Sequence, residues 1–387
     1  SSTQPLTGPA APGYSEIAPA SNAYFQYVNA HGGVYGRKLK YIYLDDGYNP
    51  SNTPAVTRKL VLQDNVFAMF SALGTPTHLA VAGYLNTEKV PDLFVSSGCN
   101  CWNDVSRYPY TFGWQPDYTI EGKILGQYID QSLGGKKVGY FYQNDEFGQD
   151  GVKGLDEKIS PSSVVSRQNY VTTNTNIRPQ IAALQASGAQ VVVAYTVPAF
   201  TALALLAAVT LNYHPVWVVS NVGSDPPTLT GLLSSFSKGK AGAALLTGMV
   251  SDTYLPLVGD SSNPWISLFQ RIKGQYASSL PWDGNVLYGM AQAYTLVQEL
   301  KAAGRNPTRA SLVKTVEDTK ISDGPGLVPF GYSPTNHLGY LGVQVDTIGS
   351  GGTASTVGPI YTSTNTGPIK QYNGTPATPP ASGIPGH

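Results

Sequence analysis

The stretch Gln4-Pro5-Leu6-Thr7-Gly8-Pro9-Ala10 is a Gly/Pro loop, and together with the segment up to Gly47 it decides the fold. After the length of one helix the chain reads Asn29-Ala30-His31-Gly32-Gly33, and a Gly-Gly pair at such a place is typical of a helix end. A strand predicted at 40–44 then ends in Asp45-Asp46-Gly47. A loop, a helix and a strand in this order indicate the start of an α/β fold.

Length and charge limit the class of protein. A chain of 387 residues can bury two substantial cores, so we expect two lobes. Lys and Arg (24) balance Asp and Glu (24), which gives no hint of the basic surface that a nucleic-acid partner requires, and we expect none. No run of 18 apolar residues occurs, so we find no candidate membrane span in the sequence.

Hydrophobic runs and turn residues predict alternating strands and helices. This alternation favours parallel sheets with helices on both faces, and ligands of such sheets bind beyond the carboxyl ends of the strands. We expect strands at 40–44, 66–71, 91–95, 137–142, 164–170, 190–195, 215–220, 242–249 and 341–345. We expect helices at 53–63, 78–86, 120–132, 149–158, 177–187, 199–211, 263–278, 284–303 and 309–318.

Two loops after neighbouring strands of the first half carry polar side chains. Gly74-Thr75-Pro76-Thr77 precedes a helix, whose free N–H groups and Thr hydroxyls could bind a carboxylate or could simply cap the helix. Ser96-Ser97-Gly98-Cys99-Asn100-Cys101-Trp102 follows the next strand, with Asn100 as a polar contact and Trp102 as a stacking face. The alternative for this second loop is a structural turn with buried small residues.

Three loops of the same type follow strands of the second half, at 143–148, 195–200 and 220–224. Asp145 and Glu146 could form an acid/base pair, but we expect them to serve the N-terminus of the next helix. Five loops after parallel strands together indicate one kind of binding site. Between the two groups, Trp114-Gln115-Pro116-Asp117 reads as a crossover between lobes.

Evidence for catalysis or a metal site is missing from the sequence. Cys99 and Cys101 are separated by one residue, and because a disulfide there closes a very small ring, we expect free thiols. No His-rich or Cys-rich segment supplies further metal ligands, no His-Glu-x-x-His or Gly-x-Ser-x-Gly motif occurs, and we expect no metal, cofactor or enzymatic activity. His78 could donate a hydrogen bond to a ligand or be an ordinary first-turn residue.

Several of these motifs together resemble the type I periplasmic binding proteins, and specifically the branched-chain amino-acid-binding family of ABC transporters. The matching motifs are Pro5-Leu6-Thr7-Gly8-Pro9, Asn29-Ala30-x-Gly32-Gly33-x-x-Gly36, Asp45-Asp46, Gly74-Thr75-Pro76-Thr77, Tyr142-x-x-Asp145-x-Phe147-Gly148 and Tyr288-Gly289. They cover about residues 4–345.

The resemblance implies two Rossmann-like α/β lobes with parallel sheets, joined by three hinge crossings. We place the crossings near 114–117, 248–252 and 326–332. The lobes would then comprise residues 1–115 with 252–328, and 116–251 with 329–361, and 362–387 would form a tail or strap. In relatives a complete strand precedes the first loop, so we expect upstream sequence, including an export signal, to be missing here.

The resemblance also implies a ligand site. The ligand carboxylate would lie on Gly74, Thr75 and Thr77 and on Gly98, Cys99 and Asn100. Phe147 would cover the ligand, Trp102, Trp114 and Thr196 would add contacts, and Asn221 would stand where an acidic side chain usually meets the ammonium. Because a buried ammonium without a carboxylate costs several kcal/mol, Asn221 favours an aromatic or other carboxylate over an amino acid, and Asn221→Glu should reduce affinity.

The resemblance thus implies an extracytoplasmic solute-binding protein of an ABC importer, with a membrane permease as partner and closure of the lobes on a small ligand. We expect a monomer in the periplasm or at the cell surface, and the presence of a lipid anchor stays open. The alternatives are a branched-chain amino-acid-binding protein and a ligand-sensing regulatory module of the same fold. An α/β hydrolase or transferase is disfavoured because no catalytic constellation is present.

Overall fold

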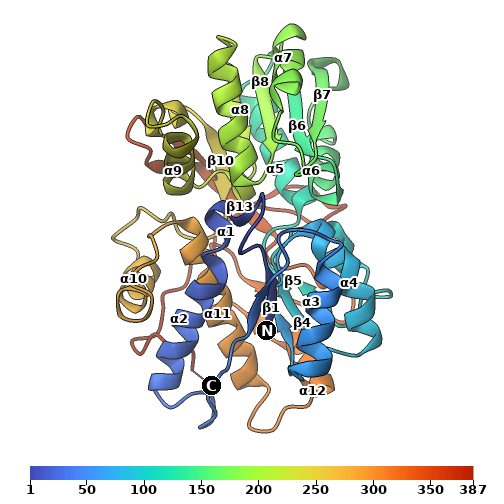
Figure 1. The fold of residues 1–387 in the computed structure, drawn as a ribbon, viewed down its shortest axis with the longest axis vertical. Helices are drawn as coiled ribbons and strands as arrows, with labels where there is room; N and C mark the ends of the chain where they lie inside the picture. The colour runs from blue at the N-terminus through green and yellow to red at the C-terminus, as the bar shows by residue number, and fades with distance from the viewer. Residues whose placement is uncertain (387) are drawn as a thin grey trace. The chain divides into compact units, whose positions relative to one another are not determined.

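The computed structural model describes residues 1–386, which form two units (Figure 1). Unit 1 contains Ser1–Asp117, Asp260–Leu341 and residues 374–386, and unit 2 contains Tyr118–Gly259 and Gly342–Asn373. No helix within 1–386 combines the length and apolar character that crossing a bilayer requires.

Unit 1 has two sets of short parallel strands and one short antiparallel pair, flanked by helices. Backbone N–H groups of Phe70 and Leu73 donate to the carbonyls of Ser1 and Thr3, and so join the pair β1-β2 to the sheet β3-β4-β5. The strands are β1 (Ser2–Gln4), β2 (Tyr43–Asp45), β3 (Met69–Phe70), β4 (Asp92–Val95), β5 (Thr111–Gly113), β11 (Lys320–Ile321) and β12 (Phe330–Gly331). The helices are α1 (Ala11–Tyr14), α2 (Ile17–Ala30), α3 (Thr53–Arg58), α4 (Thr75–Thr87), α10 (Pro264–Tyr276), α11 (Gly284–Ala302) and α12 (Arg309–Asp318).

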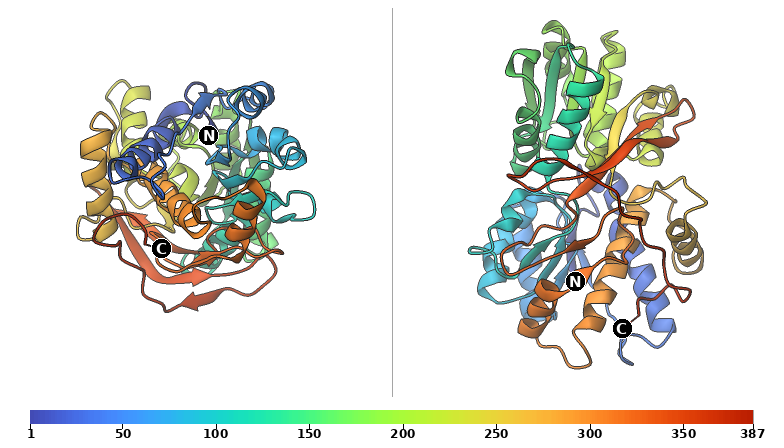
Figure 2. Two further views of the ribbon diagram at one scale, coloured as in Figure 1. Left: turned by 90° about the horizontal axis from the view of Figure 1, so that it is seen from below. Right: turned by 180° about the vertical axis from the view of Figure 1, so that it is seen from behind.

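Unit 2 is built on one eight-stranded sheet of order β15-β14-β13-β10-β9-β8-β6-β7. Its strands are β6 (Val138–Gln143), β7 (Val164–Tyr170), β8 (Val191–Tyr195), β9 (Val216–Val219), β10 (Val250–Thr253), β13 (Gly342–Ile348), β14 (Ala354–Thr362) and β15 (Lys370–Tyr372). Its helices are α5 (Tyr118–Ser132), α6 (Glu146–Asp156), α7 (Arg178–Ala186), α8 (Pro198–Thr210) and α9 (Pro226–Phe236). Strands β6 to β10 are parallel, whereas β13, β14 and β15 add antiparallel pairs at one side (Figure 2).

The predicted α/β alternation is confirmed, and the corrections lie mostly in the second half. The strand predicted at 242–249 is wrong: Ala243–Leu246 forms a 3-10 turn, and β10 begins only at Val250. Helix α9 and strand β14 were not predicted. Strand β14 is largely exposed, so it lacks the apolar run from which a buried strand is recognised.

The unit boundaries differ from the predicted lobes in three stretches. Residues 116–117 lie in unit 1, whereas the predicted second lobe begins at 116. Residues 252–259 stay with unit 2, because β10 pairs with β13 up to Thr253. Residues 329–341 stay with unit 1, because β12 pairs with β11 and because the His337 N–H donates to Asn103 Oδ1 at 2.9 Å. Hinge motion at these crossings remains a prediction.

The segment predicted as a tail, 362–387, is divided between the units over its described residues. Strand β15 pairs with β14 in unit 2, whereas residues 374–386 run back along α2 and α10 of unit 1 (Figure 2, right, dark red). There the Trp265 indole N–H donates to the Ala377 carbonyl at 2.8 Å, and the Tyr24 hydroxyl donates to the Gly383 carbonyl at 2.9 Å. The chain therefore changes unit four times, after residues 117, 259, 341 and 373.

Candidate functional site

The start of α4 in unit 1 offers hydrogen-bond donors that the helix itself does not use. Gly74 is the N-cap residue with φ of +108°, and a Cβ there would lie 2.4 Å from Thr77 Oγ1, so only glycine fits. Pro76 has no N–H, which leaves the Thr75 and Thr77 N–H groups as the helix's first donors. Neither group donates a backbone hydrogen bond within residues 1–386, and both residues are buried. Their contact with a ligand stays a prediction.

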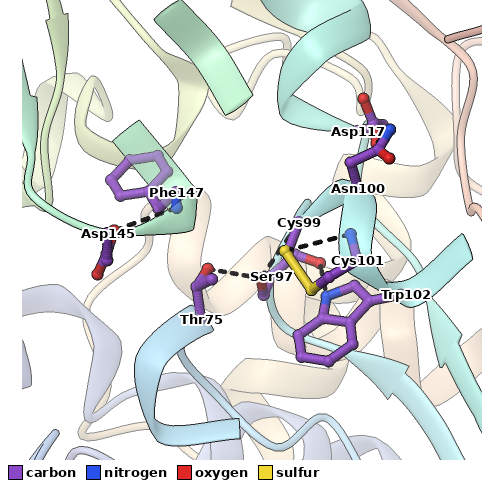
Figure 3. The surroundings of a disulfide bond; sticks show 9 residues. All are labelled: Thr75, Ser97, Cys99, Asn100, Cys101, Trp102, Asp117, Asp145 and Phe147. Carbon is purple, nitrogen blue, oxygen red and sulfur yellow. Dashed lines mark hydrogen bonds between the residues drawn. A yellow bond between two sulfur atoms is a disulfide. The ribbon is translucent and has the colours of Figure 1, made fainter. Parts of the chain in front are cut away.

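The Thr75 hydroxyl pairs with a side chain from the neighbouring loop. Thr75 Oγ1 lies 2.7 Å from Ser97 Oγ, and both residues are buried (Figure 3). Only one of the two hydroxyls can donate to the other, so one hydroxyl hydrogen stays available. Thr77 differs, because its hydroxyl donates to the Leu73 carbonyl at 2.7 Å. The structure thus brings Thr75 together with Ser97. The sequence analysis quoted Ser97 as part of the loop but did not predict it as a ligand contact.

Cys99 and Cys101 form a disulfide, which corrects the expectation of free thiols (Figure 3). Their Cα atoms are 5.1 Å apart, within the range that disulfides require, because the chain turns into a 3-10 helix at Asn100–Asn103. The Cys99 N–H donates to Ser97 Oγ at 3.2 Å, so the turn is tied directly to the Thr75–Ser97 pair. Gly98 and Cys99 are both buried in this turn.

Trp102 is a core residue of unit 1. It has no exposed surface, packs with Ala82, Val95 and Tyr108, and donates its indole N–H to the Ser97 carbonyl at 3.1 Å. The side chain therefore stabilises the loop from within the core, and its contact with a ligand stays a prediction.

The remaining unit 1 residues that were predicted also have partners within the unit. Asn100 Nδ2 donates to Asp117 Oδ2 at 3.0 Å, and Asn100 is only partly buried. The Trp114 ring is buried in edge-to-face contact with Tyr288 and Tyr340. A direct role of Asn100 or Trp114 in ligand binding stays a prediction.

His78 has a structural partner, which answers the question that its sequence position left open. Its Nε2 lies 2.6 Å from Asp92 Oδ2, and both side chains are buried. The Thr111 hydroxyl donates to the same carboxylate oxygen at 2.8 Å. This pair joins α4 to β4 and β5, so His78 positions the helix that carries Thr75.

In unit 2, Asp145 caps helix α6 as expected. Its Oδ1 accepts the Phe147 N–H at 3.1 Å, which satisfies a donor of the first turn. Phe147 itself is buried against Tyr118 and Tyr195, with ring centroids 4.7 and 5.8 Å away. Its expected contact with a ligand remains a prediction.

Thr196 lies on a tightly packed crossing of two loops. Its hydroxyl is 2.6 Å from the Thr201 hydroxyl, and it is fully buried. A Cβ on Gly223 would lie 2.0 Å from the Thr196 carbonyl oxygen, so only glycine allows the two loops to approach this closely. The predicted contact of Thr196 with a ligand stays a prediction.

Asn221 is held by two buried carboxyl groups. Ser220 caps the 3-10 turn Asn221–Gly223 that follows β9. Glu121 Oε1, from α5, accepts both the Asn221 N–H at 2.9 Å and its Nδ2 at 2.8 Å. Asp252 Oδ2, from β10, accepts from the same Nδ2 at 2.9 Å. The sequence analysis missed Glu121 and Asp252, because nothing in their local sequence shows that α5 and β10 bring them to Asn221.

The carboxyl groups around Asn221 have shifted pKa values. Burial raises the pKa of Glu121, and burial together with the charge of Glu121 raises the pKa of Asp252 well above its usual range. Burial and then the charge of Asp252 raise the pKa of Asp346 on β13 to about 8. With a pKa of about 8, Asp346 retains its proton at neutral pH, where an exposed carboxyl group would release it.

Within each unit, these loops provide hydrogen-bond donors and acceptors that the surrounding side chains hold in place. Among residues 1–386, no group of three or more His, Cys, Asp or Glu side chains is arranged to hold a metal ion. The arrangement is suited to recognising a ligand by hydrogen bonds.

Solved structures share the fold at low sequence identity. A possible leucine/isoleucine/valine-binding protein from Rhodopirellula baltica superposes with a TM-score of 0.80 at 21% identity, over 92% of this chain and 95% of that one. A fatty acid ABC transporter substrate-binding protein from Thermomonospora curvata superposes with a TM-score of 0.78 at 21% identity, over 94% of this chain and 92% of that one. A branched-chain amino acid ABC transporter protein from Thermus thermophilus, with bound valine, superposes with a TM-score of 0.79 at 18% identity, over 94% of this chain and 96% of that one. These likenesses establish the fold.

A curated relative and a family model extend the comparison to sequence. The "Amino acid binding protein" of Pseudomonas aeruginosa is 24% identical over 178 residues, which are 43% of this chain and only 44% of that relative. The model of the family described as "Periplasmic binding protein" matches residues 2–352, which is most of the chain. This family comprises substrate-binding proteins, not enzymes, and it implies an extracytoplasmic location. The chain therefore belongs to the type I periplasmic binding protein family.

Proposed function

We propose that the chain is the solute-binding protein of an ABC importer and binds a small organic carboxylate, with an aromatic or other carboxylate favoured over an amino acid. Closure of the two units on the ligand and docking on a membrane permease are parts of this proposal that rest on the family. We also expect a monomer without a nucleic-acid partner.

The observation that carries the proposal is the donor set at the start of α4. The Thr75 and Thr77 N–H groups and the spare hydroxyl hydrogen of the Thr75–Ser97 pair are three donors within one short stretch. The positive end of the helix dipole favours an anion at the same place. No Lys or Arg occurs at 74–77 or 96–102, so a singly charged carboxylate suits these loops better than a phosphate dianion.

A neutral residue at position 221 supports the preference against an amino acid. Asn221 supplies no charge of its own, and the two carboxyl groups that adjoin it, Glu121 and Asp252, are buried behind it. Branched-chain amino-acid binding is the second candidate, since solved structures of that kind share the fold.

A thermal-shift screen tests the proposal with amino acids, aromatic acids, short amides and sugars at millimolar concentration. A micromolar ligand should stabilise the chain by about 4 kcal/mol. We expect the strongest shifts from carboxylates that are not amino acids. A strong response to leucine, isoleucine or valine alone would favour the second candidate, and a response confined to sugars would contradict the proposal.

Variants of α4 locate the carboxylate. Thr75→Ala removes a hydroxyl from the donor set and should weaken binding of the best carboxylate about tenfold in calorimetry. Thr87→Ala, at the exposed far end of the same helix, is the matched control and should bind like the wild type. Equal affinities of the two variants would contradict this site.

A further inference from the structure

The two cysteines of the disulfide differ in how far solvent reaches them. The bond joins Cys99 and Cys101 across a single residue, Asn100. Cys99 is 1% exposed, whereas Cys101 is only partly buried. A reagent in solution therefore approaches the bond from the side of Cys101. Because the 387 residues contain no third cysteine, a reduced pair can re-form only this disulfide within one chain.

The turn that the disulfide closes is connected to the hydroxyl pair of unit 1. The Cys99 N–H donates to Ser97 Oγ at 3.2 Å, and Ser97 Oγ lies 2.7 Å from Thr75 Oγ1 (Figure 3). The Ser97 hydroxyl is thus fixed by the turn on one side and by Thr75 on the other. The sulfurs of two separate thiols cannot approach each other as closely as two bonded sulfurs, so reduction widens the turn and releases this contact.

The residues on both sides of the turn are held by contacts that do not need the disulfide. The Ser96 N–H donates to the Ala72 carbonyl at 2.9 Å, and the Ser97 N–H donates to the Val95 carbonyl at 2.8 Å. Trp102 is buried and donates its indole N–H to the Ser97 carbonyl at 3.1 Å. A disulfide that closes so short a loop also removes little entropy from the unfolded chain. Reduction should therefore leave unit 1 folded and release only the turn.

A hydrogen bond at the Cys99 sulfur favours one direction of thiol–disulfide exchange. The Cys101 N–H donates to Cys99 Sγ at 3.3 Å, and such a donor stabilises the thiolate that leaves when Cys101 Sγ is attacked. The attacking thiolate of a dithiol bonds to Cys101 Sγ, and Cys99 leaves and takes up a proton. The second thiol then attacks the dithiol's own sulfur in this mixed disulfide, and Cys101 leaves and takes up a proton. The dithiol is oxidised to a disulfide, and the chain gains the two electrons and two protons that it loses.

We propose that the Cys99–Cys101 disulfide is a reversible redox site, that a dithiol such as that of a thiol–disulfide oxidoreductase reduces it by attack at Cys101, and that reduction loosens the Thr75–Ser97 pair. The site lies entirely within unit 1. Its redox chemistry goes beyond the proposed function, and only its effect on ligand affinity rests on that function.

Mass spectrometry of the full chain tests the redox chemistry. Millimolar dithiothreitol without denaturant should allow iodoacetamide to label both cysteines, and oxidised glutathione added before the label should prevent this. The single variants test the direction of attack. The Cys101 thiol of Cys99→Ser should react with iodoacetamide at least about tenfold faster than the Cys99 thiol of Cys101→Ser. A disulfide that is reduced only in denaturant, or a Cys99 thiol that reacts as fast as Cys101, would overturn the proposal.

Hydrogen exchange separates release of the turn from general stability. The reduced wild type and Cys99→Ser/Cys101→Ser should exchange the amides of 97–101 roughly tenfold faster than the oxidised chain. Strand β6 in unit 2 is the internal control and should exchange at the same rate in every form. Unchanged exchange at 97–101, or faster exchange along the whole chain, would overturn the proposal. If the double variant does not fold, the reduced wild type still decides the matter.

Calorimetry then measures the effect on the ligand. The tightest-binding carboxylate from the screen should bind the reduced chain about three- to tenfold more weakly, because one hydrogen bond that fixes the Thr75–Ser97 pair is lost, and reoxidation should restore the affinity. Equal affinities of the two forms would overturn the effect of reduction on this pair. A chain that binds no carboxylate in either form would overturn the proposed function, whereas the labelling and exchange results would still decide the redox site.

Discussion

Trp102 and Glu121 show that the role of a residue depends both on its type and on where the fold places it. A Trp in a loop after a strand offers a stacking face, but in the fold it is enclosed by Val95 and Tyr108 and has no exposed surface. Glu121 was not singled out in the sequence, yet α5 places it against Asn221. Residue type tells which contacts a side chain can make. Which contacts it does make depends on residues elsewhere in the chain, such as Tyr108 for Trp102 and Asn221 for Glu121.

Another buried acid, Glu299 on α11, gives a prediction about pH. Burial raises the pKa of Glu299 from 4.5 to about 8. The folded chain therefore keeps this proton up to about pH 8, whereas the unfolded chain releases it near pH 4.5. The contribution of Glu299 to the free energy of unfolding is therefore greatest below about pH 4.5. It falls as the pH rises to about 8, by at most about 1.4 kcal/mol per pH unit. Glu299→Gln, which cannot ionise, should lose less stability between about pH 5 and 8.

Chemical denaturation at about pH 5 and about pH 8 measures this difference. Asp130→Asn changes an exposed acid and serves as the control, which should follow the wild type at both pH values. The same pH dependence in Glu299→Gln as in the wild type would show that Glu299 does not hold a proton at neutral pH.

At the scale of elements, local signals predicted some boundaries and missed others. Gly74 and Pro76 mark the start of α4, but the predicted helix begins only at His78, because Thr75-Pro76-Thr77 reads as a loop. The Gly-rich and Pro-rich end of the chain reads as a tail or an extended strap. Its order comes from contacts of 374–386 with α2, α10 and α11, and no local pattern encodes them.

These contacts predict the effect of removing single hydroxyls. The Tyr27 hydroxyl donates to the Ser382 carbonyl at 2.6 Å, and Tyr24 binds Gly383 similarly. Tyr24→Phe and Tyr27→Phe should each lower the stability of the chain by about 1 kcal/mol and speed protease cleavage within 374–386. Tyr128→Phe is the control, since its hydroxyl makes no hydrogen bond that the structure records within 1–386. Cleavage at the wild-type rate in all three variants would show that the Tyr24 and Tyr27 hydroxyls do not hold the segment 374–386 in place.

At the scale of the whole molecule, the α/β class and the family follow from motifs spread along the chain, and both are confirmed. The donor loops at 74–77 and 96–102 were also recognisable, because each follows a predicted strand. The exact points at which the chain changes unit were not recognisable, since the pairing of β11 with β12 determines where 329–341 belongs. The Cys99–Cys101 disulfide was missed for a similar reason, because it depends on the 3-10 turn that comes after Gly98.

The central claim, that the chain binds a small organic ligand through its carboxylate, is tested most directly by calorimetry of one matched pair. The tightest-binding acid from the screen is compared with its own carboxamide, which keeps the shape and removes the negative charge. We predict one site per chain and a carboxamide that binds roughly ten- to a hundredfold more weakly, because hydrogen bonds to the anion are lost. A carboxamide that binds as tightly as the acid would contradict the account.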